Sequence, residues 1–435
     1  MTLRNSILAS FSTLVSTVVM SFFTGLCITR ILEEEGRGIY SLLQADVTVL
    51  TFLLSFNIPV TLVYLLSKGE YARERIIGAS LSMLLLGAIV VLGLVGLAFS
   101  GVIGLDLLLP GTGGRRLYLI YLAWAILYAV FQGWVVSLFI GLRKFKVVNR
   151  MNLVSAILLV SLYGGLLAVS GQGGAGNIEP VLYIAIFSQC ALAIAWLVCY
   201  VALVGVWPRF VWDGPLLRSM LVFSALGYVS SLVHQLHYRM DVWFLSEFKG
   251  MSELGLYAVA VGTIQLFFMV PNAVVQVLNP HLIKEELGTV LPKFVLYSRL
   301  VFTLVFLGGI VAVPLSSWLL PLLYGEAFTG SVRAFQLLLP GVLFGSATKL
   351  LALLVIRSGK LIYNLAASLL GLACTVWMDL WLIPEHGLLG ASVTSAVANF
   401  VVFAVVLWAV TYRLRIPMAN YFILLPADIG RLWRS

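Results

Sequence analysis

Charged residues are scarce in this chain of 435 residues: they make up 10% of it, against 61% hydrophobic residues, and the mean hydropathy is +1.06. Soluble globular proteins carry about 25% charged residues, so this composition excludes that class. Cysteines and histidines are also few, with four of each, and the sequence has no CxxC motif and no histidine at metal-ligand spacing beside a cysteine. We therefore predict no metal site and no cofactor, and we expect the cysteines to be apolar packing residues.

The sequence also lacks the alternating pattern of barrel strands and any loop long enough to hold a catalytic domain, so neither a β-barrel nor an enzyme is predicted. Apolar runs of about 20 residues, the length that crosses a hydrocarbon core of ~30 Å, recur along the whole chain. These runs predict an all-α polytopic membrane protein with about twelve transmembrane helices, at 7–28, 39–66, 76–99, 117–140, 151–170, 181–206, 220–245, 256–282, 294–320, 334–356, 361–383 and 387–410.

The net charge of +9 comes from an uneven distribution of basic residues across the membrane. Nineteen of the 27 lysines and arginines fall on the side that holds both termini and six fall on the other side, while Arg239 and Lys349 lie within spans. Because loops rich in lysine and arginine stay in the cytoplasm, both termini are predicted to be cytoplasmic in a cell membrane. Topology thus accounts for the positive charge, and no nucleic-acid partner is predicted.

An internal repeat divides the chain into two halves. The connection Arg30–Ser41 returns half a chain length later as Glu247–Ala258, and Arg143-Lys144-Phe145 returns as Gly359-Lys360-Leu361. Each half contains six spans, an even number, so two parallel six-helix repeats are predicted. The corresponding domains are an N-terminal lobe at 1–212, a C-terminal lobe at 213–412 and a cytoplasmic, interfacial tail at 413–435.

The span at 220–245 contains an unusual group of ionisable residues. A charge at the centre of a transmembrane helix costs about 2.5–3.5 kcal/mol on insertion scales, so such a residue indicates a functional site. At helical spacing His234, His237, Tyr238 and Asp241 fall on one face, with Arg239 on its flank.

Arg239 and Lys349, as cations within spans, suggest an anionic ligand. The alternative is that Arg239 pairs with Asp241 or Asp46 and that Lys349 reaches the inner surface. One aspartate among Asp46, Asp241 and Asp379 could carry a coupling proton or sodium ion, unless it forms an ion pair or ends a helix. His234 and His237 could titrate during transport, or simply pack between helices.

Several short motifs stand out by their order and spacing. They are Arg30-Ile31-Leu32 with Gly38-Ile39-Tyr40, Asp241 followed by Gly255-Leu256-Tyr257-Ala258, Pro280, Leu323-Tyr324-Gly325 with Phe328, Gly359-Lys360, and Ile383-Pro384 followed by Gly387-Leu388-Leu389-Gly390-Ala391-Ser392. Together these motifs resemble the polysaccharide or O-antigen flippase family of the multidrug, oligosaccharidyl-lipid and polysaccharide exporter superfamily. One departure is Glu33, where the family often has glycine after the leucine, so the turn there can differ in shape.

The resemblance implies a V-shaped, MATE-like pair of lobes that moves a polyprenyl-diphosphate-linked oligosaccharide to the outer leaflet by alternating access. Arg239, Lys349 and Arg30 are then expected to bind the anionic headgroup. Membrane lipids, a polysaccharide polymerase and glycosyltransferases are the expected partners. A drug antiporter of the same superfamily is an alternative, although acidic rather than basic residues would suit cationic drugs. A membrane glycosyltransferase or polymerase is another alternative, but its long outer loop with catalytic residues is missing.

Overall fold

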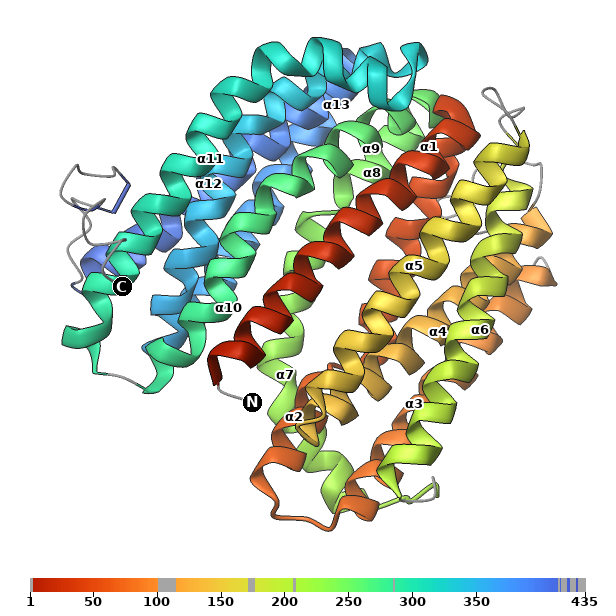
Figure 1. Ribbon diagram of the computed structural model, residues 1–435, viewed down its shortest axis with the longest axis vertical. Coiled ribbons are helices and arrows are strands. Elements are labelled where there is room, and N and C mark those ends of the chain that lie inside the picture. Colours follow the sequence, from red (N-terminus) through yellow and green to blue (C-terminus); the bar gives the residue numbers. More distant parts are fainter. Residues whose placement is uncertain are drawn as a thin grey trace. The chain divides into compact units, whose positions relative to one another are not determined.

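The structure is a computed structural model that describes residues 3–100, 115–170, 177–205, 209–284, 286–413, 415, 421–422 and 428. Within these residues every regular element is a helix. Contacts divide the chain into two compact units, Met1–Glu247 and Phe248–Ser435, which are described separately as the first and second unit. Figure 1 shows the helices of both units in the order of the chain.

The first unit is built from eight helices. They are α1 (Leu3–Ser55), α2 (Ile58–Lys68), α3 (Arg73–Phe99), α4 (Arg115–Gly141), α5 (Phe145–Ser170), α6 (Glu179–Val204), α7 (Gly214–His237) and α8 (Met240–Phe248).

The second unit contains five α-helices, two 3₁₀ turns and a π-helical turn. They are α9 (Met251–Ile264), η1 (Gln265–Phe268), α10 (Met269–Lys284), α11 (Leu287–Tyr324), η2 (Glu326–Gly330), α12 (Ser331–Arg357), α13 (Ile362–Trp408) and η3 (Ala409–Arg413).

The predicted polytopic helical fold is confirmed. In the described part of the chain nine helices are long and apolar enough to cross a membrane. Two of them, α1 and α13, are kinked: α13 covers the last two predicted spans, and α1 covers the first span and the beginning of the second, which α2 completes. The bent pair Gly214–Val222 and Gly227–Phe248 supplies one more. Together they account for all twelve predicted spans.

The repeat is visible in the backbone of each unit. Glu33 interrupts α1 with φ 56° and ψ −165°, and Gly250, half a chain length later, precedes α9 with φ 87° and ψ −175°. Glycine adopts this conformation without penalty, whereas a residue with a Cβ is strained there. At Glu33, where the family often has glycine, the turn thus keeps a conformation that favours glycine. Helices α3, α4 and α5 also start close to half a chain length before α11, α12 and α13.

The predicted span at 39–66 is broken into two helices. Phe56 and Asn57 have φ values of 46° and 56°, which end α1 and separate it from α2. Pro59 follows in the first turn of α2, where its missing N–H removes no helical hydrogen bond. The apolar run predicted the length of this segment but not its break.

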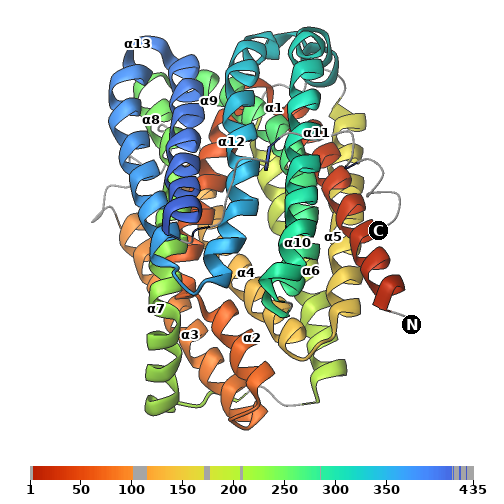
Figure 2. The ribbon, with the colours of Figure 1, turned by 90° about the vertical axis from the view of Figure 1, so that its left-hand side faces the viewer.

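Helix α7 packs against α1, α2 and α3, as Figure 2 shows for α2 and α3. Asp213 caps the start of α7 by accepting a hydrogen bond from the Leu216 N–H at 3.2 Å, and Arg75 of α3 forms an ion pair with the same carboxylate. Tyr228 of α7 also donates a hydrogen bond to the Leu53 carbonyl of α1, at 2.9 Å. These contacts explain why the first compact unit includes α7 and α8. The predicted lobe boundary at 212/213 was placed by the sequence repeat, and it stays a prediction.

The motif tyrosines Tyr40 and Tyr257, which occupy equivalent positions of the repeat, anchor equivalent helix starts. In the first unit the Gln44 amide donates to the Tyr40 hydroxyl at 3.0 Å and to the buried Tyr121 hydroxyl at 2.7 Å. In the second unit the Tyr257 hydroxyl lies 3.1 Å from the Ser395 hydroxyl of α13. The bond from Gln44 to Tyr121 ties the second half of α1 to α4, and the bond between Tyr257 and Ser395 ties the start of α9 to α13.

The Gly387 motif makes a tight turn within α13. Gly387 has φ 56°, and a Cβ at this position would clash with Oε2 of Glu253. The same oxygen accepts a hydrogen bond from the Leu388 N–H at 2.9 Å, so a carboxylate from α9 caps the second half of α13. This contact explains why the motif begins with glycine.

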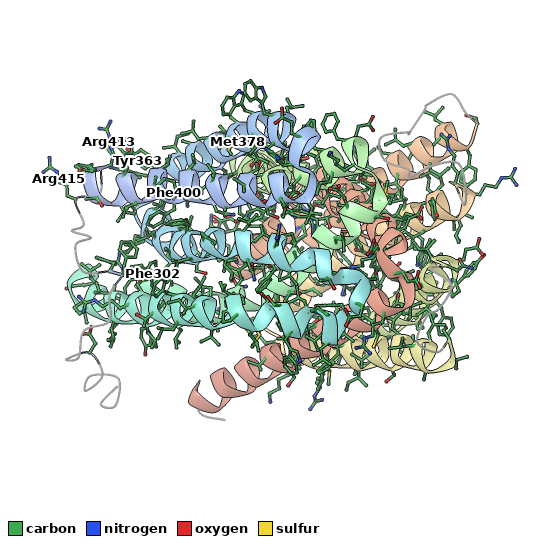
Figure 3. The ribbon with its side chains drawn as sticks, turned by 90° about the horizontal axis from the view of Figure 1, so that it is seen from above. Phe302, Tyr363, Met378, Phe400, Arg413 and Arg415 are labelled. Carbon is green, nitrogen blue, oxygen red and sulfur yellow. The ribbon has the colours of Figure 1, made fainter. Side chains whose placement is uncertain are left out.

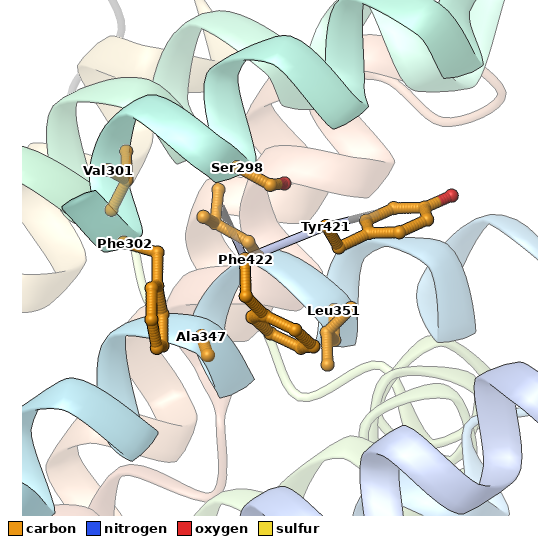
Figure 4. A pocket seen from close by; sticks show the side chains of 8 residues that line it. Ser298, Val301, Phe302, Ala347, Leu351, Tyr421 and Phe422 are labelled. Atoms are coloured by element: carbon orange, nitrogen blue, oxygen red, sulfur yellow. The ribbon is translucent and has the colours of Figure 1, made fainter. Parts of the chain in front are cut away.

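The tail residues that the structure describes pack on the second unit. The ring centroids of Tyr421 and Phe294 lie 5.8 Å apart. Oδ2 of Asp428 forms a buried ion pair with Nη1 of Arg299 at 2.6 Å. A small apolar pocket lies beside the tail (Figure 4), and it is lined by Ser298, Val301, Phe302, Ala347, Leu350, Leu351, Tyr421 and Phe422.

The two ends of the kinked helix α13, together with the π-helical turn η3 that follows it, carry basic and aromatic residues, as expected near an interface. The Arg413 guanidinium lies 5.4 Å from the Trp408 ring centroid. The ring centroids of Tyr363 and Trp408 lie 6.4 Å apart. Figure 3 shows Tyr363, Arg413 and Arg415 at the same end of the pair formed by the two halves of α13. Arg431, Trp433 and Arg434, which suggested an interfacial anchor, lie outside the described residues.

Candidate functional site

The ionisable stretch of the first unit lies at a break between helices. Helix α7 ends at His237 and α8 begins at Met240, so Tyr238 and Arg239 form a two-residue turn inside what the sequence predicted as one continuous span. The Tyr238 and Arg239 N–H groups bond to carbonyls a few residues earlier, which tightens the last turn of α7. No proline or glycine marks this break in the sequence.

The break separates the environments of the residues predicted to share one face. His237 and Asp241 are buried, each 6% exposed, whereas His234 is exposed and Arg239 is half-buried. The rings of His234 and His237 both pack edge-on against Tyr238, with centroids 4.7 and 4.9 Å away. Tyr238 is therefore the centre of a small aromatic cluster at the break.

Asp46, on the second half of α1, is fully buried in the first unit. The Trp243 indole of α8 donates a hydrogen bond to its Oδ1 at 2.8 Å. Its Oδ2 is buried and has no hydrogen-bond partner within the described residues. Trp243 was not among the predicted site residues, although a buried indole N–H needs an acceptor, and Asp46 is an acceptor within a span.

Arg239 does not neutralise either aspartate. Among the described residues its guanidinium makes no hydrogen bond or ion pair, so the predicted alternative of a pair with Asp46 or Asp241 is not formed. Asp241 instead accepts a hydrogen bond from the Val242 N–H at 2.9 Å. Arg30 is half-buried on α1, just before the strained Glu33.

Lys349, on α12 of the second unit, has neutral partners. Its ammonium donates a hydrogen bond to Oδ1 of Asn272 at 2.8 Å and lies 4.3 Å from the ring centroid of Phe268. No carboxylate in the described part of the chain forms an ion pair with it. Sequence reasoning missed Asn272 and Phe268, because the 3₁₀ turn that ends at Phe268, four residues before Asn272, leaves no mark in an apolar run.

Asp379, the remaining aspartate within a span, is fully buried on the first half of α13 in the second unit. The candidate residues therefore form two groups that are described separately. The first unit contains Arg30, Asp46, His234, His237, Arg239 and Asp241, and the second contains Lys349 and Asp379.

Comparison with known proteins agrees with the motifs. Residues 2–285 match the family model described as polysaccharide biosynthesis protein. A capsular polysaccharide biosynthesis protein, CapF from Staphylococcus aureus, is 29% identical over 163 residues, which are 36% of this chain and 41% of that protein. The chain thus matches less than half the length of this curated relative.

Solved transporter structures share the fold. The lipid II flippase MurJ, in an inward closed conformation, aligns with a TM-score of 0.72 at 12% identity, over 92% of this chain and 87% of that chain. An inward-facing multidrug resistance MATE transporter of the MOP superfamily aligns with a TM-score of 0.68 at 12% identity, over 95% of this chain and all of that chain. The fold is therefore MATE-like. Because the family model matches residues 2–285, well over half of the chain, the chain belongs to the polysaccharide biosynthesis protein family.

Proposed function

We propose that this protein is a flippase, not an enzyme, that moves a polyprenyl-diphosphate-linked oligosaccharide from the cytoplasmic to the outer leaflet by alternating access. Membership of the polysaccharide biosynthesis family supports the glycan, and the likeness of fold to a lipid II flippase supports the lipid carrier. The substrate headgroup carries phosphate charges that need cationic partners, while its lipid tail can remain in the bilayer.

The observation that carries this proposal is the pair of uncompensated cations within spans. Arg239 has no partner among the described residues, and Lys349 is held by an amide and a ring rather than by a carboxylate. A cation that protein acids do not neutralise keeps its charge available for an anionic ligand. At ~4 Å the attraction between unit charges is about 1 kcal/mol in bulk water and about 4 kcal/mol at an effective dielectric of 20.

We assign Arg239 and Arg30 in the first unit, and separately Lys349 in the second unit, as candidate ligands of the diphosphate. Arginine offers a planar fork for two phosphate oxygens, whereas lysine offers a compact point charge. A cation in a partly dry site can therefore hold a headgroup that bulk solvent would release.

Asp46 is our candidate for a coupling proton. Its buried Oδ2 has no partner within the described residues, and a proton on that oxygen would remove the charge that burial disfavours. Asp241, Asp379, His234 and His237 remain secondary candidates, because each of these side chains interacts with a neighbouring group. A sodium ion is the alternative coupling ion.

We place the protein in the cell membrane with both termini in the cytoplasm, because of the distribution of its basic residues. A reporter that is active only in the cytoplasm, fused after Ser435, tests this orientation. A polysaccharide polymerase and glycosyltransferases are the proposed functional partners, since they would use and supply the carried glycan.

The proposal is tested by measuring how much lipid-linked glycan reaches the outer leaflet of cells, with a membrane-impermeant glycan label. Arg239→Ala and Lys349→Ala should each lower delivery by about 10- to 100-fold, the effect of losing a hydrogen bond to a charged group, with normal protein abundance. Arg239→Lys should also impair delivery, because it keeps the charge but loses the fork. Lys360→Ala, which removes an exposed cation outside the spans, is the matched control.

If Arg239→Ala loses protein from the membrane in step with activity, and the double variant Arg239→Ala, Asp241→Ala recovers both, the binding role of Arg239 is contradicted. Unchanged delivery in both single variants would contradict the proposed anionic headgroup site.

A further inference from the structure

The 3₁₀ turn η1 carries two adjacent phenylalanines that each fit against a glycine. A Cβ at Gly345 of α12 would lie 3.1 Å from the Phe268 ring, and a Cβ at Gly308 of α11 would lie 3.3 Å from the Phe267 ring. Both distances are too short for relaxed packing, so a side chain at either glycine would displace a ring. The two glycines therefore leave room for this turn to pack closely against α11 and α12.

Lys349 follows Gly345 by one helical turn and lies over the ring that Gly345 accommodates. Its ammonium, 4.3 Å from the Phe268 centroid, is within the range of a cation–π contact. Asn272 follows Phe268 by four positions, so it extends from the next turn and reaches the same ammonium at 2.8 Å. The ammonium thus lies between a ring and an amide that come from successive turns of the same segment.

The hydrogen bond to Lys349 orients the Asn272 amide. A lysine ammonium has only donors, so the amide must direct its oxygen toward it. The Nδ2 donors then point away from Lys349, and within the described residues they have no hydrogen-bond acceptor. Asn272 is exposed in the second unit. Because the amide oxygen accepts from a cation, its N–H groups become better donors.

We propose that Asn272 is a second ligand for phosphate, acting together with Lys349 on the diphosphate of a lipid-linked substrate. This inference rests on the proposed function and adds a residue to its headgroup site. The ammonium has two donors left after its bond to Asn272, and Nδ2 supplies two more. Four donors on adjacent groups suit the oxygens of a phosphate. Because Asn272 is neutral, it adds hydrogen bonds to phosphate without strengthening the attraction of the site for every anion.

The test is direct binding of farnesyl diphosphate to the purified full-length protein in nanodiscs of zwitterionic lipid, with farnesol and inorganic pyrophosphate as comparison ligands. Asn272→Ala should weaken farnesyl diphosphate binding about 10-fold or more, as expected for a hydrogen bond to a charged group. Asn272→Asp should weaken it further, because the new carboxylate would pair with Lys349 and repel phosphate. Gln276→Ala, which removes an exposed amide one turn later on α10, should bind as the wild type does.

Three results would overturn the inference. If Asn272→Ala binds farnesyl diphosphate as tightly as the wild type while Lys349→Ala does not bind it, Asn272 is not a ligand and the proposed function stands. If the wild type does not bind farnesyl diphosphate, the inference and the headgroup site of the second unit both fail. If pyrophosphate binds as tightly as farnesyl diphosphate, the site recognises free phosphate rather than a lipid headgroup.

Discussion

Replacing Glu33 by glycine should stabilise the protein, although it removes a side chain. Glu33 has φ 56° and ψ −165°, a region that is essentially restricted to glycine, and a residue held there is strained by roughly 1–3 kcal/mol. Its side chain is exposed, and no hydrogen bond or ion pair with another described residue compensates for this strain. Glycine has more freedom to lose on folding, which costs about 0.5–1 kcal/mol. The expected net gain is therefore about 0.5–2 kcal/mol.

The chain contains its own matched control for this prediction. Gly250 occupies the same conformation in the second unit, and a Cβ there would meet no heavy atom within 4 Å. Gly250→Ala should thus introduce the backbone strain without a clash, so it should destabilise the protein by a similar amount. The two substitutions are expected to shift stability in opposite directions.

Thermal unfolding of the purified protein in detergent, followed by tryptophan fluorescence, measures both effects. For a unit of this size 1 kcal/mol corresponds to about 2–4 °C, so Glu33→Gly should raise Tm by roughly 1–8 °C. Glu33→Ala should leave Tm nearly unchanged, because alanine is strained in the same way. If Glu33→Gly lowers Tm, or if Glu33→Ala raises it equally, backbone strain at this turn is not the cause.

Two other predictions concern buried charges. Asp46→Asn should leave protein abundance normal, lower glycan delivery, and make the remaining delivery insensitive to a protonophore. Delivery that stays as protonophore-sensitive as in the wild type would exclude Asp46 as the coupling residue. Asp428→Ala should lower the free energy of unfolding by about 3–5 kcal/mol, because it leaves the Arg299 guanidinium buried without its 2.6 Å partner. The double variant Arg299→Met, Asp428→Leu should recover much of this loss in a denaturation experiment, and equal loss in both variants would argue against the ion pair as the cause.

Helix breaks show where sequence reasoning reached its limit. The turn at Gly387 follows a recognisable glycine motif, and the break before Pro59 follows the preference of proline for a first turn. The break at Tyr238 and Arg239 has no such residue nearby, and the 3₁₀ turn at Gln265–Phe268 lies within an uninterrupted apolar run. The rings of the 3₁₀ turn pack against glycines of distant helices, and neither feature has a local signal, so local sequence preferences did not predict them.

The candidate site shows a similar division. The ionisable residues stood out because lipid penalises a charge wherever it occurs in a span, and this penalty depends only on local sequence. Their partners did not stand out. Trp243 lies 197 residues from Asp46, and Asn272 lies 77 residues from Lys349, so each pair exists only when distant helices meet.

The sequence by itself determined the membrane class, the twelve spans and the repeat of two half-chains, because hydrophobic length and motif spacing are properties of the linear chain. Only the tertiary structure decided that Arg239 is not neutralised by a neighbouring aspartate and that Lys349 is held by an amide and an aromatic ring. The physical reason is that compensation of a buried charge depends on distances of a few ångströms between side chains from different helices, and those distances arise only when the helices pack.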